Sequence, residues 1–167
     1  MQTSTVDQPK TFELSAAGKE LVKKELVRYE TKESAIIPCL YQVQKENEGW
    51  VSRAAIHHLS ELMDIPQSRI NEVFEFYTMF NKKPVGKYHV QVCCNVACAM
   101  SGTREMTDML LKELDVVEGE VSADKKFTIT RVECLGACDK APMMQVNEDY
   151  WEDLTPQSAL EKLRGLN

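Results

Sequence analysis

Four cysteines in the second half of the chain have the spacing of metal ligands. Cys93 and Cys98 form a C-x4-C pair, and Cys134 and Cys138 form a C-x3-C pair. The 35 residues between the pairs leave room for a helix and a strand, so two loops could meet at one site. Four thiolates make a soft tetrahedral ligand set, which selects zinc or an iron–sulfur cluster. The choice between these two metals decides the function of the chain.

The spacing leaves three interpretations open. Structural zinc sites use pairs from C-x2-C to C-x4-C, so both pairs are permitted, although the common C-x2-C form is absent. A [2Fe–2S] cluster takes four thiolates, and C-x4-C pairs occur among ferredoxins, so the cluster is favoured. Disulfides are disfavoured, because six cysteines without a secretory signal indicate a reducing compartment.

Composition and charge indicate a globular protein and argue against binding to nucleic acid. The chain has 167 residues and a net charge of −6, which suits one large or two small globular domains. Residues 85–167 carry 9 basic and 14 acidic side chains, which argues against nucleic-acid binding. No apolar run is long enough to span a membrane, and the first ten residues lack the apolar core of a signal peptide.

Hydrophobic periodicity divides the chain into parts. Residues 1–14 are predicted to be a flexible tail, and the breaker-rich residues 81–86 a linker. Residues 15–80 between them show helical spacing in four segments. These four helices are expected to begin near Ser15, Lys32, Ser52 and Pro66.

Residues 87–167 combine strand and helix patterns, and both cysteine pairs fall where a strand gives way to a loop. The sequence therefore predicts an α+β protein, with an N-terminal helical bundle followed by a small α/β domain. The predicted order of this domain is β-α-β-β-β-α, over Lys87–Cys93, Thr103–Leu114, Phe127–Val132, Pro142–Val146, Tyr150–Trp151 and Pro156–Leu163.

Several segments together resemble the 24-kDa (E) subunits of NADH:quinone oxidoreductase, respiratory complex I. The resemblance covers about residues 15–165 in the order of that family. The segments that carry it are Val92-Cys93 through Cys98, Glu133-Cys134-Leu135-Gly136-Ala137-Cys138, Ala141-Pro142-Met143, Ile36-Ile37-Pro38, Gly49-Trp50-Val51, Phe76-Tyr77-Thr78-Met79-Phe80 and Pro84-Val85-Gly86-Lys87-Tyr88.

This resemblance implies a thioredoxin-like domain over residues 87–167 that holds one [2Fe–2S] cluster. Carried over position by position, the implied ligands are Cys93, Cys98, Cys134 and Cys138. The family usually has threonine or another small polar residue after the first ligand, where this chain has Cys94. Cys94 is therefore an alternative first ligand. Strand parity places it on the apolar face with Val90 and Val92, which favours Cys93 as the ligand.

The implied function is electron transfer as a subunit of NADH:quinone oxidoreductase. FMN and NADH would be bound by a partner, the 51-kDa (F) type subunit, and residues 15–80 would dock on such partners. Neither a G-x-G-x-x-G nor a G-x4-G-K-[ST] motif is present, so no NADH-oxidising site is expected on this chain. The expected location is a peripheral arm on the cytoplasmic face of the inner membrane, among the other peripheral-arm subunits.

Three rival functions remain at this point. A free thioredoxin-like ferredoxin is the less favoured one, because a diffusible carrier would have no use for residues 15–80. The small subunit of an NAD-reducing hydrogenase or formate dehydrogenase would carry the same cluster, whereas a zinc-stabilised scaffold would carry none.

The remaining candidate side chains have simpler interpretations. His57 and His58 lie on a predicted helix, and His89 is separated from Cys93 by about 13 Å of strand, so none is expected to bind the same metal. Cys39 lies among apolar residues and is predicted to be buried. For Phe76 and Phe80, the sequence leaves core and interface equally open.

Overall fold

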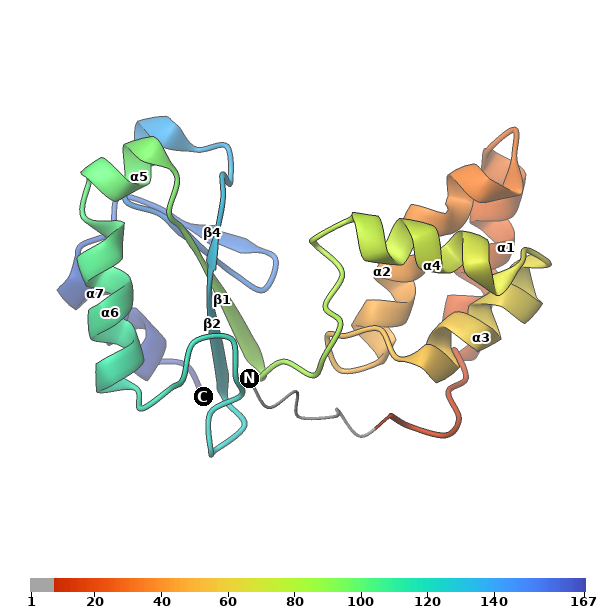
Figure 1. Cartoon of the computed structure of the whole chain (residues 1–167), viewed down its shortest axis with the longest axis horizontal. Helices are drawn as coiled ribbons and strands as arrows, with labels where there is room; N and C mark the ends of the chain where they lie inside the picture. Colours follow the sequence, from red (N-terminus) through yellow and green to blue (C-terminus); the bar gives the residue numbers. More distant parts are fainter. Residues whose placement is uncertain (1–7) are drawn as a thin grey trace. The chain divides into compact units, whose positions relative to one another are not determined.

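The computed structural model describes residues 8–167, which fall into two compact units (Figure 1). The boundary between them in the sequence lies between Pro84 and Val85. The ends of the predicted linker are each held by one unit. The amide of Asn81 donates to Gln44 Oε1 of the first unit at 2.7 Å. The amide of Gly86 donates to Thr128 Oγ1 of the second unit at 2.8 Å. The two units are described separately below.

The first unit contains the four predicted helices, and two of them have the predicted caps. The Ser15 hydroxyl accepts from the Gly18 amide and the Ser52 hydroxyl from the Ala55 amide, which satisfies backbone donors that have no partner inside the helix. The second predicted helix is divided into a 3-10 turn and an α-helix. The elements are α1 (Ala16–Arg28), η1 (Lys32–Ala35), α2 (Ile36–Glu46), α3 (Arg53–Met63) and α4 (Gln67–Phe76).

The core of the helical unit comes from the apolar stripe of each helix. Cys39 is fully buried in it, as predicted. Phe80 is also a core residue, with 2% of its surface exposed, whereas Phe76 is 78% exposed. Part of the predicted tail is packed on this unit as well, since Leu14 is 2% exposed and its amide donates to His58 Nε2. Residues 1–7 of that tail lie outside the described residues.

The second unit is built on a four-stranded mixed sheet with the order β2-β1-β3-β4. The central strand pairs parallel with β2 and antiparallel with β3, and β3 pairs antiparallel with β4. Parallel neighbours need a crossover, and helices supply it between β1 and β2. The strands are β1 (Tyr88–Cys93), β2 (Phe127–Val132), β3 (Met144–Val146) and β4 (Asp149–Trp151).

The helices of this unit are α5 (Val96–Met100), α6 (Thr103–Glu113) and α7 (Pro156–Arg164), with a 3-10 turn η2 (Cys138–Lys140). Figure 1 shows α6 and α7 on the same side of the sheet. The predicted strand parity is confirmed, because Val90 and Val92 are fully buried in one core with Met106 of α6 and Leu163 of α7. No helix within residues 8–167 is long and apolar enough to cross a membrane.

Candidate metal centre

Cys93 is the last residue of β1 and lies at the carboxyl end of the sheet. It pairs with Val132 of β2, and its amide donates to the Met143 carbonyl at 3.4 Å. Its side chain is 3% exposed, and the thiol donates to the Glu133 carbonyl at 3.0 Å. The first predicted ligand therefore already contacts the segment that carries the second pair.

Cys98 lies in α5 and not in a loop, so the prediction that both pairs lie in loops is wrong for this residue. The cause is a cap: the Asn95 side chain accepts from the Val96 amide at 2.8 Å and starts a short helix directly after the strand. Gly102, with φ +93°, separates this helix from α6. Cys98 is 2% exposed, on the inner side of α5.

The second pair lies on the loop between β2 and β3. Gly136 adopts φ +82°, a conformation that glycine reaches without strain, and its amide donates to Cys134 Sγ at 3.3 Å. Cys138 begins η2. The end of this loop is fixed to the segment after β4, because the amide of Asp153 donates to the Lys140 carbonyl at 3.0 Å. Cys134 and Cys138 are both exposed.

The four predicted ligands are electrostatic neighbours. Burial raises the pKa of the Cys98 thiol to about 11, and a hydrogen bond with Cys93 and the proximity of Cys138 add to this shift. The pKa of Cys138 is also raised, first by Cys134 and then by burial and by Cys93. Neighbouring thiols oppose one another's ionisation, which is why Cys93 and Cys134 contribute to raising the pKa values of Cys98 and Cys138 respectively.

Cys94 faces away from this group. Its thiol lies 3.5 Å from the Val92 carbonyl, and the side chain approaches the hydroxyls of Thr103 and Thr107 on α6. Burial raises the pKa of Cys94, while the nearby Arg131 lowers it. Cys94 therefore lies on the helix-covered face of the sheet, as strand parity predicts.

The donor set fits a two-iron cluster. Two buried and two exposed thiols from two segments would supply four sulfur ligands, and the Gly136 amide donates a hydrogen bond to one of these sulfur atoms. Residues 8–167 contain no group of three or more His, Cys, Asp or Glu side chains arranged around a single ion position. Cys93 and Cys98 lie in one buried cluster with Met143, and Leu135 and Ala137 of the second cysteine segment pack against it.

His58 and His89 each have a partner other than a cysteine. His58 accepts from the Leu14 amide at 3.3 Å, and its ring lies 6.0 Å from that of Phe12. His89 lies 3.2 Å from Thr130 Oγ1, and burial lowers its pKa to about 4.

Two residues next to the site escape sequence reasoning. Asn95 caps α5, and its amide group also donates to Glu133 at 3.3 Å, which links the two cysteine segments. An asparagine before a short apolar run is a recognisable cap signal. Tyr150 donates from its hydroxyl to the Leu135 carbonyl at 2.7 Å. No local pattern indicates that contact, because it depends on how β4 pairs in the sheet.

Comparisons with known proteins agree with this arrangement. The family model described as thioredoxin-like [2Fe-2S] ferredoxin matches residues 22–167. The E subunit of NADH-quinone oxidoreductase from Rickettsia bellii is 44% identical, over 81% of this chain and 83% of its own length. The mitochondrial NADH dehydrogenase [ubiquinone] flavoprotein 2 of Dictyostelium discoideum is 36% identical, over 98% of this chain and 67% of its own length.

A solved structure gives independent support for the fold. A crystal structure of NAD+-reducing [NiFe]-hydrogenase aligns with a TM-score of 0.66 at 20% identity. The alignment covers 77% of this chain and 22% of the hydrogenase chain. The predicted fold class, helices followed by a thioredoxin-like α/β domain, is confirmed. The chain therefore belongs to the thioredoxin-like [2Fe-2S] ferredoxin family, in the group of the E subunits of NADH-quinone oxidoreductase.

Proposed function

We propose that this chain is an electron-transfer subunit of NADH:quinone oxidoreductase that holds one [2Fe–2S] cluster on Cys93, Cys98, Cys134 and Cys138. The observation that carries the proposal is that the two cysteine segments meet: Cys93 and Cys98 lie in one buried cluster against which Leu135 and Ala137 of the second segment pack, and the Cys93 thiol donates to the Glu133 carbonyl. Membership of a [2Fe-2S] family supports the choice of cluster over zinc. When bound, the cluster supplies one-electron exchange.

The exposure of the ligands suits electron exchange with another protein. Cys93 and Cys98 are buried, whereas Cys134 and Cys138 are exposed. One side of the centre would therefore be shielded from water, and the other could face a partner at short range. Residues 85–167 carry 14 acidic against 9 basic side chains. Reduction adds a negative charge, so this acidic surplus would favour the oxidised form and lower the reduction potential.

The electron donor in this proposal is the flavin of a partner subunit of the 51-kDa (F) type, which also binds NADH. This chain has neither a G-x-G-x-x-G motif nor a phosphate-binding G-x4-G-K-[ST] loop that would bind these molecules itself. The names of the relatives, which are subunits of NADH-quinone oxidoreductase and NADH dehydrogenase, support assembly into such a complex. The proposed location is the peripheral arm, on the cytoplasmic face of the inner membrane.

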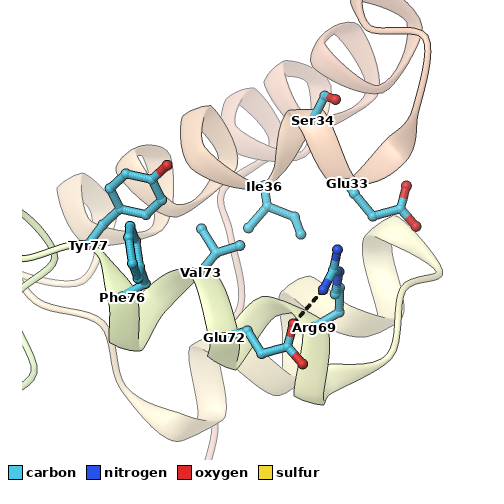
Figure 2. Close-up of a pocket in the computed structure, with 8 residues that line it drawn as sticks. All are labelled: Glu33, Ser34, Ile36, Arg69, Glu72, Val73, Phe76 and Tyr77. Atoms are coloured by element: carbon cyan, nitrogen blue, oxygen red, sulfur yellow. Dashed lines mark hydrogen bonds and ion pairs between the residues drawn. The ribbon is translucent and has the colours of Figure 1, made fainter.

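The helical unit is proposed to dock this subunit on its neighbours. A cavity of about 400 Å³ lies between η1, α2 and α4. Figure 2 shows Ile36 and Val73 at its centre, with Phe76 and Tyr77 at one end and the ion pair of Arg69 at the other. Because Phe76 is 78% exposed beside this cavity, it offers an aromatic anchor of the kind enriched at protein interfaces.

One rival keeps the cluster but changes the complex. The small subunit of an NAD-reducing hydrogenase or a formate dehydrogenase would use the same ligands. The hydrogenase similarity is 20% in sequence, against 44% for the Rickettsia bellii protein, and so supports the respiratory complex. Co-purification separates them, since the subunits recovered with the tagged chain identify the assembly.

The cluster itself is tested on the chain purified without oxygen. We expect a reddish-brown protein with two irons and two acid-labile sulfides per chain, and an electron paramagnetic resonance signal only after reduction. A colourless chain with one zinc would exclude the electron-transfer function. Calorimetry should detect no micromolar site for NADH or flavin on this chain.

A further inference from the structure

The peptide group between Leu135 and Gly136 makes a hydrogen bond at each of its two ends. Its N–H donates to Cys134 Sγ at 3.3 Å. Its carbonyl accepts from the hydroxyl of Tyr150 at 2.7 Å. One peptide plane therefore connects a tyrosine hydroxyl to the sulfur of a proposed cluster ligand.

Tyr150 is held firmly enough to fix this peptide. It lies on β4, where it pairs with Gln145 of β3, and β3 pairs in turn with the central strand β1. The turn between β3 and β4 is also attached to β1, because Asn147 accepts from the His89 amide at 2.9 Å and donates to the Lys87 carbonyl at 3.1 Å. The backbone that carries Tyr150 is thus held by the sheet and not by the cysteine loop.

The glycine makes the peptide dependent on this contact. Gly136 has φ +82°, and no atom beyond its two chain neighbours lies within 4 Å of the place where a Cβ would stand. Side-chain packing at residue 136 therefore does not hold the peptide in its orientation. Two contacts do: the bond from the amide to the sulfur and the bond from Tyr150 to the carbonyl.

We propose that Tyr150 is a positioning residue that sets the strength of the hydrogen bond from Gly136 to Cys134 and, through it, the reduction potential of the centre. This inference rests on the proposed function. A donor on the carbonyl polarises the peptide and makes its N–H a stronger donor, since hydrogen bonds in a chain reinforce one another. An N–H directed at sulfur stabilises the more negative, reduced state, so the Tyr150 hydroxyl raises the potential.

The test is the potential of the full chain with Tyr150→Phe, followed by electron paramagnetic resonance during redox titration. Tyr150 is 48% exposed, so loss of one hydroxyl is compatible with folding. We expect the equilibrium to shift about threefold toward the oxidised form, which is about 28 mV at 59 mV per tenfold change. An unchanged potential in a loaded variant would overturn the inference.

A matched control is available in the same domain. The hydroxyl of Tyr88 also donates to a main-chain oxygen at 2.7 Å, that of Asn167, and Tyr88 lies at the opposite end of β1 from Cys93. Tyr88→Phe should leave the potential unchanged. An equal shift in both variants would assign the effect to general loosening of the domain and would also overturn the inference.

A second variant acts in the opposite direction and does not remove the contact. Site-specific 3-fluorotyrosine at position 150 is a stronger hydrogen-bond donor, so it should raise the potential. This arm decides the question if Tyr150→Phe loses its cluster: a rise supports the inference, and no change contradicts it. Failure of the proposed function is distinguishable, because the unmodified chain would then contain no cluster at all.

Discussion

Cys93 and Cys94 are adjacent in sequence, but their side chains lie on opposite faces of the sheet. The Cys93 thiol is grouped with Cys98 and Met143. The Cys94 thiol approaches the hydroxyls of Thr103 and Thr107 on α6. The Cys93 thiol faces the second cysteine segment, since it donates to the Glu133 carbonyl, and side chains alternate along an extended chain, so Cys94 faces the opposite side.

Exchange of each thiol for a hydroxyl tests this assignment. Cys94→Ser should keep two irons per chain and the unmodified spectrum, with a stability loss of about 1 kcal/mol, because only a half-buried contact changes. Cys93→Ser should lose the cluster or alter its spectrum strongly, since a soft ligand becomes a hard oxygen donor. Iron content and visible absorption are the measurements. The reverse pattern would show that Cys94 is the first ligand.

Phe76 is predicted to contribute to partner affinity, whereas Phe80 is predicted to contribute to the stability of the helical unit. Phe76→Ala removes a side chain that is 78% exposed, so the free energy of unfolding should change by less than about 0.5 kcal/mol. The affinity of the Phe76→Ala chain for the flavin-binding partner should fall about tenfold or more, as expected for an aromatic interface anchor. Affinity is measured by titration of the purified subunits. Unchanged affinity would remove Phe76 from the proposed docking surface.

Phe80→Ala serves as the matched control. Phe80 is 2% exposed, and its ring lies 5.2 Å from that of Tyr41 in the helical core. Its removal should destabilise the helical unit by about 3–5 kcal/mol, the range found for buried phenylalanines. Urea unfolding of the full chain measures this loss, which Phe76→Ala should not reproduce.

A chain that begins at Val85 should fold and retain the cluster. All four proposed ligands follow this residue, and the second unit has its own core. Partner affinity should fall at least tenfold, because the proposed docking surface is removed. Iron content and partner titration are measured on the same sample. Full affinity of the shortened chain would contradict a docking role for residues 15–80.

Local sequence patterns predicted most helices and strands, because the apolar residues of each recur with the spacing of a helix or of a strand. The limits of Phe127–Val132 were predicted to the residue, since a β-branched run lies between charged neighbours. α5 was missed because five residues are too few to show helical periodicity. Phe76 and Phe80 could not be separated because α4 ends at Phe76 and the chain is extended at Tyr77, beyond which helical spacing has no meaning.

The candidate site was less predictable than the fold. The cysteine pairs are visible in the sequence, but their convergence depends on the pairing of β1 with β2, which places Cys93 beside Val132 and so next to Glu133. The contact from Tyr150 to Leu135 depends further on β4 at the edge of the sheet. Such contacts arise from tertiary structure, and no spacing along the chain encodes them.

His89 should make the stability of the metal-free chain depend on pH. Burial lowers its folded-state pKa to about 4, from an ordinary value of 6.5. Above pH 6.5 the ring is neutral in both states, whereas between pH 6.5 and 4 the unfolded chain binds a proton that the folded chain does not. Stability should therefore fall as pH is lowered through this window, by about 2 kcal/mol between pH 8 and 5.

Urea unfolding of the metal-free chain at a series of pH values measures this dependence. In His89→Gln the slope between pH 6.5 and 4 should decrease, because the group that takes up the proton on unfolding is gone. The glutamine amide can still reach the Thr130 hydroxyl, which lies 3.2 Å from His89 Nε2, so the variant should fold. His57→Gln, the same exchange at an exposed position of α3, controls for the loss of a histidine as such. An unaltered slope in His89→Gln would mean that this ring takes up its proton over the same pH range in the folded and the unfolded chain, which would contradict the prediction.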